Sequence, residues 1–265
     1  MALKFCSFAS GSSGNCYMIR NEQTAILIDA GTTGKRIFEG IEYTETPYED
    51  VAAILVTHEH NDHIRNLPMV TKKMMNSQVY ANKKTWEAMD SVRVERERRK
   101  VFVTGKTFDI GHFSVKPFDV PHDAAEPVGY SLFGEGKQIS VLTDVGYITD
   151  SIFEEIVEAD LLVLEANHER EMLLMGRYPY LTKRRILGEK GHLSNVSAGE
   201  CLCQIVNTKK KPRQVLLGHM SNENNDPAVA MLAVKNELMG HNIIVGKDLR
   251  IDVLLRKCRS CVYEV

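Results

Sequence analysis

The segment 57–63 constrains this chain more than any other stretch, because it contains three histidines and an aspartate within six consecutive residues. It follows directly on the apolar run 51–56. A short run without polar residues is typical of a parallel strand that is buried on both faces. The ligand-rich turn is therefore expected at the carboxyl end of a strand, which is where open α/β sheets place their sites.

The spacing within this segment predicts a metal site. His58 and His60 share a face if the chain is extended, and a following turn would bring Asp62 and His63 around a second point. Imidazole nitrogens and a carboxylate oxygen suit zinc, manganese or iron. The alternative is a solvated loop rich in histidine and aspartate, which such a dense pattern disfavours.

Polar residues of the ligand type recur at the ends of later predicted strands. His122 follows the run 113–120, Asp144 follows 138–143, Glu165 and His168 follow 161–164, and His219 follows 215–218. A buried core histidine would explain any one of these residues. Their recurrence at strand ends favours convergence on one site.

Other segments allow coarser expectations. The loop 9–15 is rich in serine and glycine, and it is either a phosphate cradle or a hairpin turn. The pattern predicts a helix over 65–75 that Asn61 or Asp62 caps. The charged stretch 93–100 is expected to be a solvated connection.

Composition limits the choice of partner and compartment. The 265 residues carry a net charge of −2, so no global basic signature indicates nucleic acid, although local patches can act alone. Of the basic clusters, 183–185 is the best candidate for phosphate contact because it precedes His192 by a few residues. No signal peptide or membrane span is evident, and six cysteines without a disulfide framework fit a cytoplasmic protein. The lone C-x-x-C at 258–261 remains a minor candidate for metal or redox chemistry. We expect one domain over 1–265.

The order of these residues resembles the five motifs of the metallo-β-lactamase fold, an α/β fold built as a four-layer αβ/βα sandwich. The order runs from Asp29 through H-x-H-x-D-H at 58–63 to His122, Asp144 and His219. The segments FASGSSGNC, LVTHEHNDH, VLTDVG, LVLEANHE, GHLSN and LGHMSNENN resemble the YycJ (WalJ) family of bacterial nucleases. That family is similar in motif order to ribonuclease Z and to cyclic-phosphate phosphodiesterases. Asn66 departs from the glycine that the family usually has there.

The resemblance implies a site with two divalent ions. One ion would be held by His58, His60 and His122. The other would be held by Asp62, His63 and His219, with Asp144 bridging the two. Two ions about 3.5–4 Å apart can activate water and clamp a phosphoryl group. The resemblance favours manganese, and the nitrogen and oxygen ligands also admit zinc or iron. Asp29 would orient a ligand imidazole through a hydrogen bond.

The resemblance also implies catalytic and substrate-binding residues. His192 would assist the leaving group, Glu165 would pair with it, and Asp62 is counted as catalytic as well as a ligand. The expected substrate contacts are Ser12, Ser13, Asn15, His168, Ser194 and Ser221. His168 either lines the site or pairs with a carboxylate behind it.

These patterns predict a metal-dependent phosphodiester hydrolase. The resemblance narrows this to a 5′→3′ exonuclease that acts on double-stranded DNA with a free 5′ end. The residues alone do not separate DNA from RNA. The alternatives are an RNA-processing or cyclic-phosphate phosphodiesterase of the ribonuclease Z type, a thioester hydrolase, and a regulatory protein that binds metal without turnover.

Overall fold

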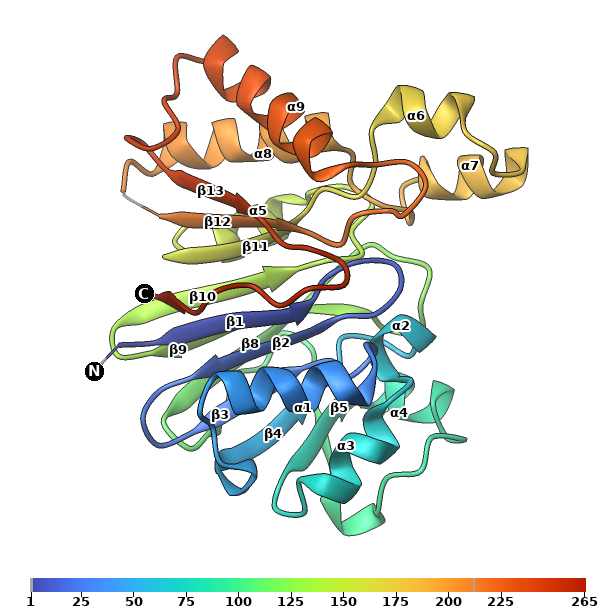
Figure 1. The fold of residues 1–265 in the computed structure, drawn as a ribbon, viewed down its shortest axis with the longest axis vertical. Coiled ribbons are helices and arrows are strands. Elements are labelled where there is room, and N and C mark those ends of the chain that lie inside the picture. Colours follow the sequence, from blue (N-terminus) through green and yellow to red (C-terminus); the bar gives the residue numbers. More distant parts are fainter. Residues whose placement is uncertain (1, 212) are drawn as a thin grey trace.

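Two seven-stranded sheets form the centre of the computed structural model, which describes residues 2–211 and 213–265 (Figure 1). The first sheet has the order β14-β1-β2-β3-β4-β5-β6, and the second has the order β13-β12-β11-β10-β9-β8-β7. The strands of the first sheet are β14 (Tyr263–Glu264), β1 (Lys4–Ala9), β2 (Cys16–Arg20), β3 (Ala25–Ile28), β4 (Val51–Leu55), β5 (Gln78–Asn82) and β6 (Arg99–Phe102). Those of the second are β13 (Arg250–Val253), β12 (Gln214–Gly218), β11 (Leu161–Glu165), β10 (Lys137–Leu142), β9 (Val128–Gly134), β8 (Phe113–Asp119) and β7 (Phe108–Ile110).

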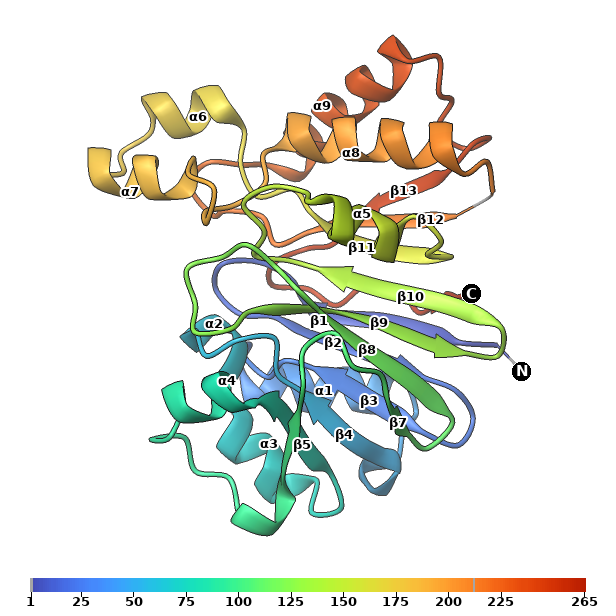
Figure 2. The same cartoon turned by 180° about the vertical axis from the view of Figure 1, so that it is seen from behind.

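Helices cover the outer faces of both sheets, as the views from front and back agree (Figures 1 and 2). On the side of the first sheet lie α1 (Gly34–Tyr43), α2 (Asn61–Ile64), α3 (Leu67–Lys73) and α4 (Lys83–Ala88). On the side of the second sheet lie α5 (Asp150–Ile156), α6 (Arg170–Met175), α7 (Tyr180–Ile186), α8 (Asn195–Thr208) and α9 (Pro227–Gly240). Short 3₁₀ turns occur at Tyr48–Asp50 and Arg96–Arg98.

Three apolar clusters fill the interfaces between these layers. One cluster, with Tyr17 and Tyr130 among its members, draws on strands of both sheets and lies between them. A second lies between the first sheet and its helices, and a third between the second sheet and α5, α8 and α9. Sheets that are apolar on both faces must be covered on both faces. The predicted four-layer αβ/βα sandwich is confirmed.

Each sheet combines four parallel strands with three antiparallel ones. The parallel sets are β3 to β6 and β10 to β13. The prediction of a buried parallel strand just before the histidine segment is confirmed, since β4 pairs in parallel with β3 and β5. Parallel strands bring their carboxyl ends to one edge of a sheet. Each half of the chain therefore has a set of strand ends at one edge of its sheet. Side chains that follow these strand ends can lie close to one another.

The predicted helix over 65–75 differs from the structure in its start and continuity. Two short helices, α2 and α3, replace it, and the chain turns between them at Asn66, whose side chain donates to Thr32 O at 2.7 Å. Neither Asn61 nor Asp62 caps α2, because the cap position belongs to His60, which makes no side-chain capping bond. Asn61 and Asp62 lie inside α2 instead.

The prediction that 93–100 is a solvated connection holds for five of its eight residues, which are exposed, but it is wrong for Val94 and Arg98, which are buried. The stretch includes the 3₁₀ turn Arg96–Arg98 and only the first two residues of β6, and the side chain of Arg98 is buried. The Arg98 guanidinium donates to the carbonyl oxygens of Thr71, Met74 and Ser77 at 2.6–2.8 Å. A charged side chain can be buried when its donors are satisfied. Arg98 therefore ties the end of α3 to the start of β5.

Two further features concern membrane-spanning helices and free thiols. No helix within residues 2–211 and 213–265 is long and apolar enough to cross a membrane. All six cysteines are free, and Cys258 and Cys261 are exposed near the carboxyl terminus.

Replacing Arg98 with methionine should destabilise the protein, because three buried carbonyl groups would lose their charged donor. Hydrogen bonds to charged groups are each worth about 1.5–3 kcal/mol, so we expect a loss of at least about 2 kcal/mol in the free energy of unfolding. Urea unfolding measures this loss, and Arg96→Met, at an exposed position, is the matched control. Equal stability of the two variants would contradict the assigned role of Arg98.

Candidate metal centre

Ligand-type side chains from both sheets meet at the edge formed by the strand ends. From the first sheet, Asp29 follows β3 and the segment 58–63 follows β4. From the second sheet, His122 follows β8, and Asp144, Glu165 and His219 stand at or just after the ends of β10, β11 and β12. The candidate site is therefore assembled from segments that are far apart in the sequence.

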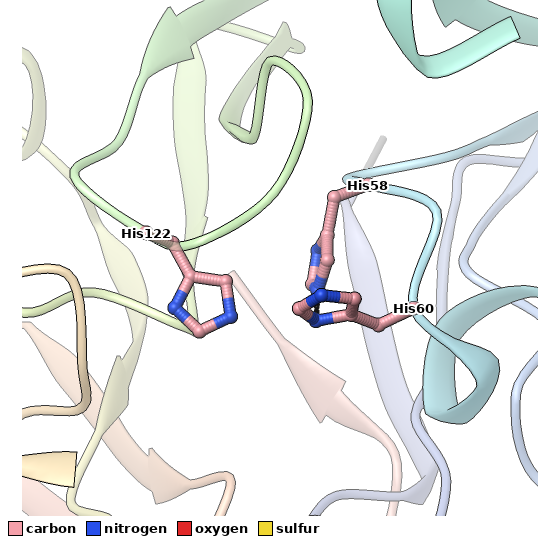
Figure 3. A group of neighbouring side chains, drawn as sticks. All are labelled: His58, His60 and His122. Atoms are coloured by element: carbon pink, nitrogen blue, oxygen red, sulfur yellow. Dashed lines mark hydrogen bonds between the residues drawn. The ribbon is translucent and has the colours of Figure 1, made fainter. Parts of the chain in front are cut away.

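The first group consists of His58, His60 and His122, whose rings point toward one another from two different loops (Figure 3). One ring nitrogen from each lies within 4.8 Å of the others. His58 Nε2 and His60 Nδ1 are 3.1 Å apart. Three imidazole nitrogens at such separations can converge on a single ion.

The second group consists of Asp62, His63 and His219, whose ligand atoms also lie within 4.8 Å of one another. Asp144 lies between the two groups. Its Oδ1 is 3.7 Å from His122 Nε2, whereas its Oδ2 is 3.2 Å from both His63 Nε2 and His219 Nδ1. One carboxylate oxygen thus faces each group, which is the geometry that a bridging ligand needs.

Unsatisfied polar atoms support the fit of a metal at this place. His122 Nε2, His219 Nδ1 and Asp144 Oδ2 are buried without a hydrogen-bond partner. Buried polar atoms without partners are rare and costly, and an ion is one way to satisfy them. All seven predicted ligands are drawn together, and their nitrogen and oxygen atoms are a donor set that zinc, manganese and iron accept.

The charge states of three of these ligands suit metal ligation. Burial lowers the pKa of His58 and of His122, so that both imidazoles are neutral. Burial would raise the pKa of Asp144, but the imidazoles of His219 and His63 hold it well below its usual value. Ligands must be deprotonated to bind a metal. His58, His122 and Asp144 meet that requirement. Against the effect of burial, by contrast, the carboxylates of Asp29, Asp144 and Asp62 raise the pKa of His63, so His63 would release a proton on binding an ion.

Asp29 holds the ligand segment from behind. Its Oδ2 is 2.7 Å from His63 Nδ1, and its Oδ1 accepts a hydrogen bond from the backbone N–H of Thr57 at 2.9 Å. The hydroxyl of Thr57 donates to Asp29 Oδ2 at 2.9 Å and lies 3.0 Å from His58 Nδ1. These contacts fix the ring orientation of two histidines, as partners of metal ligands commonly do. The role of Thr57 was not predicted, although its place directly before the first histidine was the available signal.

Three residues at the site adopt a backbone conformation that side chains rarely take. Asp29, Asp144 and His219 have φ angles of 62°, 57° and 51°. Such left-handed conformations carry a cost that the surrounding structure must offset. At His219 the backbone N–H donates to Ser10 Oγ at 2.8 Å, which joins the end of β12 to the β1–β2 hairpin loop.

His192 and Glu165 form a pair beside the ligand groups. His192 Nδ1 is 2.9 Å from Glu165 Oε1 and 3.7 Å from Asp144 Oδ1. Burial alone would lower the pKa of His192, but the carboxylate of Glu165 raises it to about 9. The second oxygen of Glu165 accepts from the backbone N–H groups of Val145 and Leu193, so Glu165 is fixed in place. The predicted pairing of these two side chains is present.

Three of the predicted substrate contacts have their polar atoms engaged within the protein. Asn15 is buried, and its side-chain amide lies 3.1 Å from His63 Nε2. Ser194 caps α8 by accepting from the N–H of Ser197, and the Ser221 hydroxyl accepts from the N–H of Asn224. These contacts give the three residues structural roles, and their contact with a substrate stays a prediction.

The remaining three predicted contacts differ in their surroundings. Ser12 and Ser13 are exposed in the loop between the antiparallel strands β1 and β2, so this loop is a hairpin turn, one of its two predicted alternatives. His168 is buried, and neither of its ring nitrogens has a hydrogen-bond partner. Burial lowers its pKa to about 4, so its imidazole is neutral. His168 makes no hydrogen bond to a carboxylate, so the second of its two predicted roles is not seen.

Comparison with known proteins places this arrangement in a family. The sequence profile of the Beta-lactamase superfamily domain matches residues 24–220. Relatives that match nearly the whole chain include two exodeoxyribonucleases. Exodeoxyribonuclease WalJ of Streptococcus pneumoniae is 35% identical over 255 residues, 95% of this chain and 94% of its own length. This chain belongs to the beta-lactamase superfamily. Exodeoxyribonuclease YycJ of Bacillus anthracis is 36% identical over 253 residues, 95% of each chain.

Solved structures agree with this placement in the beta-lactamase superfamily. The metallo-beta-lactamase fold protein YhfI from Bacillus subtilis superposes with a TM-score of 0.74 over the full length of both chains, at 16% sequence identity. Similarity at this level of identity concerns the fold. The predicted metallo-β-lactamase fold and the resemblance to the YycJ (WalJ) family are both confirmed.

Replacing Asp144 with asparagine should remove the bridge between the two ligand groups. Asparagine tolerates the left-handed backbone at this position, but it offers one oxygen where the carboxylate offers two. We expect the bound manganese to fall from two ions to one or none per chain. The loss of affinity should exceed the about 10–100-fold that removal of a ligand's hydrogen-bond partner costs. Elemental analysis after dialysis measures the ions.

The exposed Asp119 supplies the control for this experiment. Asp119→Asn removes the same charge at a residue outside the ligand groups and should keep both ions. Retention of two ions by Asp144→Asn would show that Asp144 does not bridge.

Proposed function

We propose that this protein is a metal-dependent exodeoxyribonuclease that carries two divalent ions per chain and removes nucleotides from free 5′ ends of double-stranded DNA. The observation that carries the proposal is the position of Asp144, with one oxygen toward each group of ligands and with the His192–Glu165 pair beside it. Relatives that match nearly the whole chain are named exodeoxyribonucleases, which supports DNA as the substrate.

The donor set accounts for the class of reaction. When bound, two divalent ions supply positive charge that activates water and stabilises the phosphoryl group during displacement. His58, His60 and His122 would hold one ion, and Asp62, His63 and His219 would hold the other. No thiolate is present among these ligands, so the site admits manganese as readily as zinc. We propose manganese, in line with the resemblance noted in the sequence.

His192 has the position of a group that assists the leaving oxygen. Its Nδ1 faces Glu165, so its Nε2 is left to donate a proton or a charged hydrogen bond. Its pKa of about 9 keeps the imidazole charged near neutral pH. Because Glu165 also accepts two backbone N–H bonds, it holds the His192 ring in one orientation. In this proposal His192 acts on the substrate and Glu165 positions His192.

A panel of end-labelled nucleic acids tests the function. With manganese, linear duplex DNA should release a 5′ label early as small products and a 3′ label late. A closed circular duplex of the same sequence should resist cleavage, RNA should be cleaved more slowly, and EDTA should stop all turnover. Preferential cleavage of RNA, or cutting of the closed circle, would contradict the proposal.

Replacing His192 with alanine should separate leaving-group assistance from metal binding. Positioned acid catalysis typically contributes about 10²–10⁴-fold, so kcat on DNA should fall by that factor while both ions stay bound. Bis(p-nitrophenyl) phosphate should lose much less rate, because p-nitrophenolate needs little protonation to leave. The exposed His112→Ala is the matched control and should behave like the wild type. Equal losses on both substrates would indicate a phosphate-binding role, and a lost ion would make His192 a ligand.

A further inference from the structure

A helical arm, defined here as residues 169–190, projects from the molecule beside the metal centre. It contains α6 and α7, which stand out from the rest of the chain in both overall views (Figures 1 and 2). The arm begins directly after His168 and ends two residues before His192. Both of its ends are therefore joined to the candidate site.

The arm is held in place by contacts to the loops that carry the ligands. Arg185 pairs with both carboxylate oxygens of Asp123, the residue after His122. On the other side, Glu169 N–H donates to Asn224 O at 2.9 Å, in the loop that follows His219. The turn between α6 and α7 is close to the same asparagine, since a Cβ on Gly176 would lie 2.6 Å from Asn224 Oδ1. These contacts fix the direction in which the arm points.

The outer surface of the arm is unusually apolar. Among residues 2–211 and 213–265, seventeen large apolar side chains are exposed, and six of them lie within the arm. These six are Met172, Leu174, Met175, Tyr180, Leu181 and Leu187. Tyr180 and Leu181 are each 75% exposed, and Met175 is 85% exposed. Exposed apolar surface of this density marks a place where something binds.

The charge of the arm indicates which class of partner fits. It has six basic and three acidic residues, in a chain whose net charge is −2. The basic residues are Arg170, Arg177, Lys183, Arg184, Arg185 and Lys190. Two copies of the arm would repel each other, whereas a polyanion would be attracted. Exposed aromatic and aliphatic side chains next to basic ones are the combination that binds bases and phosphates together.

We infer that the arm is a DNA-end contact, in which Tyr180 and Leu181 lie against the terminal bases and Arg184 contacts a backbone phosphate. The inference rests on the proposed nuclease function and names the surface that holds its substrate. Arg184 is exposed and serves the phosphate, while Arg185, engaged by Asp123, anchors the arm. The arm would thus hold the DNA end at a fixed distance from the ligands at His122 and His219.

DNA binding without turnover tests this surface. Fluorescence anisotropy with a fluorescein-labelled duplex, in EDTA, gives Kd for the full chain. Stacking on an exposed aromatic residue is worth roughly tenfold or more in affinity. Tyr180→Ser combined with Leu181→Ser should therefore raise Kd at least about tenfold. It should also lower the ratio of DNA turnover to bis(p-nitrophenyl) phosphate turnover.

The control pair lies on α9, where Leu232 and Met239 are 61% and 70% exposed. The double variant Leu232→Ser/Met239→Ser should leave Kd for DNA unchanged. If the arm fails to fold in the Tyr180→Ser/Leu181→Ser variant, Arg184→Gln tests the same surface through a single exposed residue. It should reduce the slope of log Kd against log salt by about 1, because one phosphate contact is lost.

Unchanged Kd and salt slope in the arm variants, with the wild type still degrading DNA, would overturn the inference and leave the proposed function standing. A wild type that degrades no nucleic acid would overturn the proposed function instead. Sedimentation provides one more outcome. A dimer that dissociates in the Tyr180→Ser/Leu181→Ser variant would mean that a second copy of the chain, and not DNA, covers the arm.

Discussion

The carboxylate of Asp144 is the group on which the rest of the site depends, because it connects the two halves of the molecule. It follows β10 in the second sheet, yet its Oδ2 lies 3.2 Å from His63, which follows β4 in the first sheet. Buried charges and unpaired polar atoms are costly, so the carboxylate at this meeting of strand ends needs positive charge around it. The four-layer packing brings these groups together, and a pair of divalent ions would supply that charge.

The support around the ligands divides into two separate networks. Asp29 and Thr57 orient His58 and His63 from the first sheet. Glu165 orients His192 from the second sheet, and it is held by hydrogen bonds from the backbone N–H groups of Val145 and Leu193. The division suits a site that must bind metal ions and also assist a leaving group. Asp29 orients a metal ligand, and Glu165 orients the histidine beside the leaving group. Left-handed backbone at Asp29, Asp144 and His219 shows where the fold accepts strain to aim these groups.

The sequence predicted the ligand clustering and much of the sandwich because these depend on local signals. Apolar runs predicted β4, β10, β11 and β12, and the polar residues at the ends of these strands were predicted as ligands. Contacts between distant segments were not predictable in the same way. Strand β9 was missed, although Val128, Tyr130 and Leu132 alternate with Gly129 and Ser131 as they do in a strand. Arg98 was assigned to solvent because nothing local indicates the three carbonyl groups that it reaches. Nothing local in the sequence indicated that Asn15 lies against His63, which is distant in the sequence.

Anomalous scattering from crystals grown with manganese tests the central claim most directly, because it places each ion without reference to activity. The account predicts two peaks per chain. One should lie among His58, His60 and His122, the other among Asp62, His63 and His219, with one oxygen of Asp144 bound to each. A single peak, or two peaks of which neither touches Asp144, would contradict it.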